Sequence, residues 1–363
     1  MQFIDLKKQY ELIKEDVLNE INQVLDSGQY ILGEKVPQLE KELATYTGAK
    51  HCIGVCDGTK AILMALMALD IKAGDEVIVP AFTFIATASM AALLGVIPVF
   101  VDVDEKTYNL DPAKIDNAIT SKTKAIIAVS LYGQCADFDA INAIAAKYGI
   151  AVIEDGAQSF GATYKGKQSC NLTTIATTSF FPSKPLGCYG DGGAILTNDD
   201  RVAEKLKWIR IHGQDKRYHH AVLGINGRLD TIQAGILLAK MRVFPEEVKL
   251  RDKVANRYNQ LLANANCVTP YLAEGNTSVY AQYTLLVGDR DGLIKHLNVN
   301  DIPTAVHYPI PLHKQPIFTH NYNGQDLSVS ERVAAKVVSL PMHPYLDEIT
   351  QDKIIATVKQ FVG

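Results

Sequence analysis

The sequence predicts an α/β protein with a large domain built on a mostly parallel, mixed sheet covered by helices on both faces, and a smaller α+β domain at the C-terminus. Its 363 residues are enough for about two domains. Between about residues 50 and 200, short β-branched segments alternate with helical patterns. A charged helical stretch at residues 242–265 then leads into a second region. We therefore expect the large domain at residues 1–245 and the small domain at residues 246–363.

The expected elements follow in chain order. Residues 1–17 carry both signs of charge and no long apolar segment, which predicts an amphipathic helix and not a secretory signal. Buried strands are expected at residues 51–55, 75–80, 97–104, 124–130, 150–155, 176–181 and 193–198. Intervening helices are expected at residues 113–119 and 138–149. In the second region, residues 278–287, a helix around 292–299 and residues 330–342 indicate the smaller α+β domain.

Composition argues against several kinds of partner. The chain has 36 Lys and Arg against 40 Asp and Glu, a net charge of −4, and no basic block, so we expect no nucleic acid. Its longest apolar run, residues 61–69, is shorter than the roughly 20 residues that a membrane span needs, so we expect no membrane. The six cysteines form no CxxC pair, which indicates free thiols in a cytoplasmic protein.

Several histidines invite a comparison with metal sites. Their spacing matches no common ligand pattern, and no cysteine or carboxylate cluster accompanies them. We therefore expect no metal at these five histidines: His212, His219, His220, His307 and His313.

Polar residues follow the first predicted strand, where ligands bind in open α/β sheets. Asp57, Gly58 and Thr59 open a helix there and offer free backbone N–H groups, a glycine and a hydroxyl. This combination can seat a phosphate. For the stretch alone, an ordinary Asp N-cap is the commoner explanation.

Other strand ends carry aromatic and acidic groups. Phe82 and Phe84 follow residues 75–80, where a ring could cover a flat ligand, although core packing is the commoner use. Asp155 ends a strand that should be central and buried, so its carboxylate should meet a cation. Gln158 lies three residues behind it, and Ser179 lies near the end of a later strand.

Lys184 lies between Pro182 and Pro185, in a tight turn ahead of several glycines. Taken alone it could equally be a solvated surface lysine. Together with a phosphate seat, an aromatic ring and a buried carboxylate, it suits pyridoxal 5′-phosphate. A lysine amine forms a Schiff base with the aldehyde of that cofactor, and desolvation lowers its pKa for this role. A carboxylate keeps the pyridine nitrogen protonated.

An ordered set of motifs resembles the DegT/DnrJ/EryC1/StrS family of pyridoxal-phosphate sugar aminotransferases over nearly the whole chain. The motifs are DGTKA, PAFTFIATA, VDVDEKTYNLDP, SLYGQCADFDAI, IEDGAQSFGATYKGK, SFFPSKPLGCYGDGGA, RIHGQDKRYHH, GRLDTIQAGIL, HYPIPLHKQP and SLPMHP. The resemblance implies fold type I, as in aspartate aminotransferase, and homodimers whose active sites borrow residues from the second subunit.

The resemblance also implies a role for each site residue. Lys184 would be the Schiff-base lysine and Asp155 the partner of the pyridinium nitrogen. The remaining cofactor contacts would be Gly58, Thr59, Phe84, Gln158, Ser179 and, from the other subunit, Asn226. Arg228, His307 and Tyr308 would reach across to the sugar nucleotide, and Tyr30 would line the same pocket.

Within the family, the motifs imply amino transfer from L-glutamate to C3 of a UDP-linked 3-keto-N-acetylglucosaminuronic acid, for a bacterial surface polysaccharide. Alternatives are another UDP- or dTDP-linked keto sugar aminated at C3 or C4, a pyridoxal-phosphate sugar dehydratase, and a binding homologue without activity. The retained Lys184 disfavours the dehydratases, in which histidine replaces it.

Four positions depart from the family pattern. Asp57 stands where asparagine is usual, Lys60 where aspartate is usual, Gly156 where alanine is common and Gly227 where serine is expected. A negative Asp57 beside a phosphate would weaken cofactor binding unless Lys60 offsets its charge.

Overall fold

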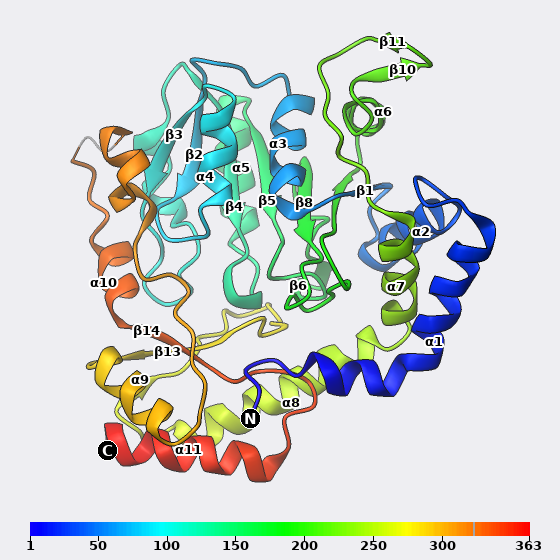
Figure 1. The fold of residues 1–363 in the computed structure, drawn as a ribbon. Helices are drawn as coiled ribbons and strands as arrows, with labels where there is room; N and C mark the ends of the chain where they lie inside the picture. The colour runs from blue at the N-terminus through cyan, green and yellow to red at the C-terminus, as the bar shows by residue number, and fades with distance from the viewer. Residues whose placement is uncertain (322–323) are drawn as a thin grey trace.

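The computed structural model describes residues 1–321 and 324–363, and a seven-stranded mixed sheet forms the centre of its larger part (Figure 1). The strand order is β1-β9-β8-β5-β4-β2-β3. Their bounds are β1 (His51–Val55), β2 (Glu76–Pro80), β3 (Ile97–Val101), β4 (Thr123–Val129), β5 (Ala151–Asp155), β8 (Ile175–Ser179) and β9 (Gly193–Thr197). Within this sheet β9 runs antiparallel to both neighbours, while the other pairings are parallel. The seven predicted strands and the mostly parallel, mixed sheet are confirmed.

Helices cover both faces of the sheet, because successive strand residues point to opposite sides. Ile127 of β4 packs on one face with α3 (Gly58–Ala68), α4 (Ala86–Leu93) and α6 (Asp200–Ile209). Its neighbours Ile126 and Ala128 pack on the other face, against α5 (Phe138–Tyr148). On that second face α2 (Lys35–Thr47) and α7 (Thr231–Met241) cover β8 and β9. Apolar runs that are buried on both sides therefore position the strand ends.

One predicted helix is wrong. Residues 113–119 form two short 3₁₀ turns, η1 (Pro112–Lys114) and η2 (Asp116–Ala118), instead of an α-helix. Asp111 caps the first turn by accepting a hydrogen bond from the Ala113 N–H, and Ile119 already has extended backbone angles. The span is too short to offset the cost of nucleating an α-helix. The helix predicted at residues 138–149 is confirmed as α5.

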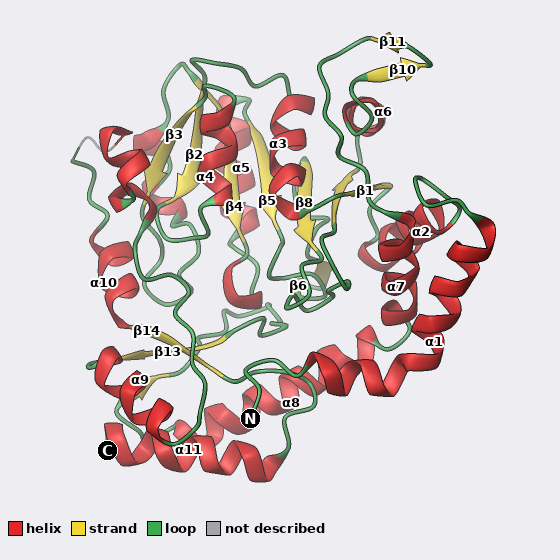
Figure 2. Cartoon of the chain, in the orientation of Figure 1, coloured by secondary structure: helices red, strands yellow, loops and turns green. Residues whose placement is uncertain are grey.

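The second region has its own small sheet and apolar core (Figure 2). Its three antiparallel strands are β12 (Cys267–Val268), β13 (Tyr283–Val287) and β14 (Val337–Leu340). The helices of this region are α8 (Phe244–Leu262), α9 (Arg290–Val299), α10 (Ser328–Lys336) and α11 (Glu348–Val362). Leu312, Phe318 and Leu327 nevertheless pack into the core of the large sheet. Because a separate apolar core surrounds β13 and α11, we propose that the boundary between the two domains lies near residue 245.

The N-terminal helix α1 (Leu6–Ser27) confirms the amphipathic helix predicted there. Asp5 caps its first turn by accepting from the Lys8 N–H, and Gly28 ends it with a φ of 65°, which favours glycine. Its buried side packs against α7. Among the described residues, no helix combines the length and apolar character that crossing a bilayer requires. The shorter elements are η3 (Leu131–Gly133), β6 (Thr163–Tyr164), β7 (Lys167–Gln168), β10 (Gln214–Lys216), β11 (His219–His220), η4 (Leu312–Lys314) and η5 (Pro316–Asn321).

Candidate active site

The carboxyl ends of the parallel strands meet at one edge of the sheet, facing the small domain. In Figure 2 the arrowheads of β5 and β8 point toward this region. Asp155 is the last residue of β5 and Ser179 the last residue of β8, and these two strands pair directly. Parallel pairing therefore brings together polar residues that lie far apart in the sequence.

Asp155 is a buried carboxylate held at both oxygens. Its Oδ1 accepts a hydrogen bond from the Ala157 N–H at 3.1 Å, and its Oδ2 accepts from the Thr87 hydroxyl at 3.3 Å. Burial raises the pKa of Asp155, while the positive charge of Lys184 acts in the opposite direction. The cation expected beside this carboxylate is therefore Lys184.

Lys184 lies in the tight turn that follows β8. Its backbone N–H donates to the Phe181 carbonyl at 2.8 Å, and a β-carbon on Gly187 would lie 2.5 Å from the Pro182 carbonyl oxygen. The turn can close this tightly because residue 187 is glycine. Burial lowers the pKa of Lys184, against the opposing effect of Asp155. A lowered pKa leaves more of the amine in its nucleophilic, neutral form, and Lys184 is only partly exposed, which argues against a solvated surface lysine.

The start of α3 has the features of a phosphate seat. A β-carbon on Gly58 would lie 2.6 Å from the Ser179 β-carbon, so glycine lets the first turn of α3 pack onto the end of β8. The Ser179 hydroxyl oxygen would lie 3.2 Å from the same β-carbon, so it borders the first turn of α3. Asp57 accepts from the Lys60 N–H at 2.7 Å, which confirms it as the N-cap. An N-cap satisfies only part of the first turn, so it leaves N–H groups free for a phosphate, and the phosphate seat stays a prediction.

The two phenylalanines after β2 differ in exposure. Phe82 is 1% exposed and packs edge-on against Tyr108, Tyr132 and Tyr308, so it belongs to the core. Phe84 is 50% exposed, with its ring centroid 5.8 Å from that of Tyr308. An exposed aromatic ring at a strand end is available to stack on a flat ligand. Of the two phenylalanines, Phe84 has such a ring.

Gln158, His307 and Tyr308 complete the walls of the same site. The Gln158 Nε2 donates to the Tyr308 hydroxyl at 3.2 Å. Burial, helped by the charge of Lys184, lowers the pKa of His307 to about 4, so its imidazole is neutral at pH 7. Burial and the charge of Asp155 raise the pKa of Tyr308. Both groups are thus neutral donors or acceptors.

This placement corrects the expectation that His307 and Tyr308 reach into a partner's site. Ala305 pairs with Ser339 of β14 in the same chain, which fixes the segment that leads to them. Both side chains interact electrostatically with Lys184 or Asp155 of their own chain. The sequence gives no signal for this contact, because it depends on how the small domain packs on the large one.

Asn226 and Arg228 line a cavity of about 500 Å³ together with Lys60, and Lys184 is not among its lining residues. The acidic Asp191 and Asp230 line the same cavity. The Tyr30 carbonyl accepts from the Thr231 N–H at 3.0 Å, and the Tyr30 side chain is 49% exposed. Within the described part of the chain, the buried Arg228 Nε has no hydrogen-bond partner.

Comparison with known proteins decides the family. The model of the DegT/DnrJ/EryC1/StrS aminotransferase family matches residues 11–359. The chain belongs to this family.

Individual relatives are similar over nearly their whole length. The chain is 58% identical over 347 residues to UDP-2-acetamido-2-deoxy-3-oxo-D-glucuronate aminotransferase of Pseudomonas aeruginosa, covering 96% of each protein. It is 47% identical over 362 residues to a pleiotropic regulatory protein of Geobacillus stearothermophilus, covering 99% of this chain and 97% of the relative.

Solved structures agree in fold. A DegT/DnrJ/EryC1/StrS aminotransferase from Brucella abortus has a TM-score of 0.97 at 43% identity, with complete coverage of both chains. NtdA from Bacillus subtilis, with bound cofactor PMP, has a TM-score of 0.93 at 33% identity and covers 100% of this chain and 85% of its own. The predicted fold is confirmed.

The aminotransferase uses pyridoxal phosphate, and the described residues fit this cofactor. The Gly58–Ser179 cradle would be filled by a single β-carbon, which explains why glycine stands there. Asp155 offers a buried carboxylate and Lys184 a desolvated amine. A phosphate, a pyridinium nitrogen and an aldehyde require this set of donors and acceptors.

The departures from the family pattern have local explanations. Lys60 Nζ forms an ion pair with Asp57 Oδ2 at 2.7 Å, so the charge of Asp57 is offset as expected. A β-carbon on Gly156 would lie 2.5 Å from the Cys170 sulfur, and one on Gly227 would lie 2.8 Å from the Met64 sulfur. In this aminotransferase the two glycines make room for sulfur atoms.

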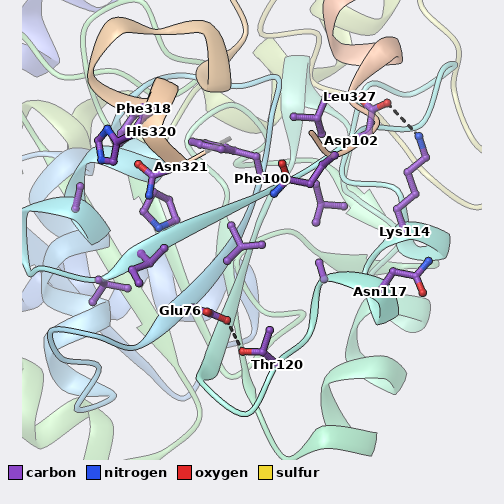
Figure 3. A pocket seen from close by; sticks show the side chains of 18 of the residues that line it. Glu76, Phe100, Asp102, Lys114, Asn117, Thr120, Phe318, His320, Asn321 and Leu327 are labelled. Carbon is purple, nitrogen blue, oxygen red and sulfur yellow. Dashed lines mark hydrogen bonds and ion pairs between the residues drawn. The ribbon is translucent and has the colours of Figure 1, made fainter. Parts of the chain in front are cut away.

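A larger cavity lies elsewhere in the described residues. It has a volume of about 1040 Å³ and runs along β3, the edge strand of the sheet, beneath η5 (Figure 3). On its rim Lys114 pairs with Asp102 at 3.0 Å and Thr120 donates to Glu76. None of the predicted site residues lines it.

Two residues that hold the site were not predicted. Thr87 lies in α4, within the PAFTFIATA motif, and fixes Asp155. Tyr132 follows β4 directly and donates its backbone N–H to the Gln158 Oε1 at 2.9 Å. The position of Tyr132 at a strand end was a usable signal, whereas Thr87 lies on a helix and carried none.

Proposed function

We propose that this aminotransferase transfers the amino group of L-glutamate to C3 of a UDP-linked 3-keto-N-acetylglucosaminuronic acid in the synthesis of a bacterial surface polysaccharide. The observation that carries the amino-transfer chemistry is the desolvated Lys184 amine beside the buried Asp155 carboxylate. The choice of sugar rests on the 58% identical relative, which is named for that substrate.

Pyridoxal phosphate supplies an electron-accepting ring that stabilises negative charge on the carbon losing a proton. Lys184 would hold the cofactor through its amine and, as a free amine, would carry the proton between the cofactor C4′ and the sugar C3. Asp155 would keep the ring nitrogen protonated, and Thr87 fixes the oxygen of Asp155 that it contacts. The N–H groups of Gly58 and Thr59 and the Ser179 hydroxyl would bind the phosphate.

The substrate side requires a second copy of the chain. We infer a homodimer in which Asn226 of one subunit contacts the cofactor phosphate of the other, and Arg228 contacts the sugar nucleotide. The Arg228 Nε, which is buried without a partner in the described chain, supports an anion at this cavity. A guanidinium suits either a uronate carboxylate or a diphosphate. Tyr30, on the adjacent loop, would line the same pocket.

The state of the cysteines bears on where the protein works in the cell. The six cysteines are free, and burial raises the pKa of Cys52, Cys135 and Cys170. Buried thiols with a raised pKa are unreactive, and free thiols are typical of proteins in a reducing compartment. We therefore infer a cytoplasmic enzyme.

The test is an end-point assay. Purified protein is incubated with pyridoxal phosphate, L-glutamate and the UDP-linked 3-keto uronate, and mass spectrometry follows the 3-amino sugar and 2-oxoglutarate. We expect one 2-oxoglutarate for each amino sugar. Amination of a dTDP-linked or 4-keto sugar in its place would reject the substrate. Release of water without glutamate would reject amino transfer.

Shared sites are tested by mixing two inactive variants, Lys184→Ala and Arg228→Ala. If each site takes Lys184 from one subunit and Arg228 from the other, statistical heterodimers restore about a quarter of wild-type activity. The absence of any recovery after confirmed subunit exchange would reject the shared site.

A further inference from the structure

Tyr132 has an unusual backbone conformation at the end of a central strand. It lies in η3 directly after β4, with a φ of 57°, in the left-handed region that non-glycine residues rarely adopt. Such conformations persist where surrounding contacts hold them, and they cluster at functional sites. In this conformation Tyr132 contacts Gln158 through its backbone N–H and His307 through its hydroxyl.

The backbone N–H of Tyr132 orients the side-chain amide of Gln158. This N–H donates to the Gln158 Oε1 at 2.9 Å, and the Gln158 Nε2 donates to the Tyr308 hydroxyl at 3.2 Å. An N–H donor cannot face the NH₂ group of an amide, so the contact with Tyr132 selects one of the two amide orientations. Because its Oε1 faces the Tyr132 N–H, Gln158 would make the cofactor contact that the proposed function gives it through its NH₂ donor.

The side chain of Tyr132 holds the opposite wall. Its buried hydroxyl donates to the backbone carbonyl of His307. The His307 Nδ1 lies 3.2 Å from the Ser339 hydroxyl, which in turn lies 2.9 Å from the Thr284 hydroxyl. His307 is thus held at its carbonyl by the large domain and at its ring by the sheet of the small domain.

We propose that Tyr132 is a positioning residue that sets both walls of the active site, the amide orientation of Gln158 through its backbone N–H and the place of His307 through its hydroxyl. The inference rests on the proposed function. It makes Gln158 a donor to an electron-rich atom of the cofactor and His307 a fixed, neutral wall facing the sugar.

The hydroxyl is tested by Tyr132→Phe, with Tyr108→Phe as the matched control. Tyr108 has a similar φ of 60°, is 7% exposed, and its ring centroid lies 6.2 Å from that of Tyr132. In Tyr132→Phe we expect the KM for the keto sugar to rise about tenfold or more, as for the loss of a buried hydrogen bond, with unchanged glutamate half-reaction and cofactor absorbance. In Tyr108→Phe we expect less than about a twofold change. Equal sugar KM values in the two variants would overturn the proposed role of the hydroxyl.

The amide orientation is tested by Gln158→Glu, without any sugar. The carboxylate accepts from the Tyr132 N–H and turns a second acceptor toward the cofactor. We expect the pH titration of the lysine-bound cofactor absorbance to shift by about one unit or more, and cofactor affinity to fall about tenfold. An unchanged titration and affinity would overturn the orientation.

The two proposals fail in different ways. If wild-type protein binds no pyridoxal phosphate, the proposed function fails before any variant is compared. If wild type binds the cofactor and transaminates while Tyr132→Phe matches Tyr108→Phe and Gln158→Glu matches wild type, only the positioning role fails. Thermal unfolding of every variant, followed by circular dichroism, verifies that each remains folded at the assay temperature.

Discussion

Glu154 is a buried carboxylate that the proposed chemistry does not use, and Glu154→Gln should remove a pH-dependent penalty on stability. The residue is 0% exposed and lies next to Asp155 in β5, on the other face of the strand. It accepts from the Ser169 hydroxyl at 2.6 Å, the Cys170 N–H at 2.9 Å and the Ser130 hydroxyl at 3.4 Å. Glutamine can satisfy the same three partners, because hydroxyls both donate and accept.

The sign and size of the effect follow from the pKa of Glu154. Burial, with a smaller contribution from the charge of Asp155, raises this pKa from 4.5 to about 7. A carboxyl whose folded pKa is raised binds its proton more tightly in the folded state. Its stabilising contribution is therefore complete below about pH 4.5 and is lost as the pH rises through 7. At 1.36 kcal/mol per pKa unit the whole loss is about 3 kcal/mol, of which about 2 kcal/mol falls between pH 5.5 and 8.

The assay is urea unfolding of the cofactor-free protein, followed by circular dichroism at pH 5.5 and pH 8. Relative to Glu154→Gln, wild type should lose about 2 kcal/mol more of its unfolding free energy over this interval. Glu204→Gln is the matched control, because Glu204 is exposed on α6. Identical pH dependences in wild type and Glu154→Gln would refute the reasoning.

Further substitutions test the packing around the cofactor. Gly58→Ala places a β-carbon 2.6 Å from that of Ser179, so we expect pyridoxal-phosphate affinity, measured by equilibrium dialysis, to fall at least about tenfold. An unchanged affinity would show that the first turn of α3 does not form the phosphate seat. Gly156→Ala should cost about 1–3 kcal/mol of unfolding free energy because of its contact with the Cys170 sulfur. Cys170→Ala in the same chain should recover most of this loss in urea unfolding, and purely additive effects would contradict the explanation.

Much of the fold could be predicted because each strand of the large sheet can be recognised from its own residues. Its strands are short runs of buried, β-branched residues, and a strand buried on both faces needs no distant information to be found. The helix expected at residues 113–119 failed because capping and backbone geometry limit that segment to 3₁₀ turns. The spacing of apolar residues alone does not distinguish an α-helix from short 3₁₀ turns.

Some contacts of the candidate site could likewise be predicted from the sequence, and others could not. Asp155, Ser179 and Lys184 follow strand ends, so parallel pairing made their meeting predictable. Tyr308 lies 150 residues beyond Gln158, and their contact depends on the packing of the two domains. Asn226 and Arg228 line a cavity that does not include Lys184. The role that we propose for them requires a second copy of the chain, which no local sequence pattern describes.

The central claim is that Lys184 carries amino-transfer chemistry. Its most direct test is the visible absorbance of purified wild type and Lys184→Ala, supplied with pyridoxal phosphate, before and after the addition of L-glutamate. We predict a lysine-bound cofactor band in wild type that converts to the aminated cofactor with glutamate, and neither the band nor a comparable conversion in Lys184→Ala. A wild-type spectrum that lacks this band and does not respond to glutamate would contradict the account.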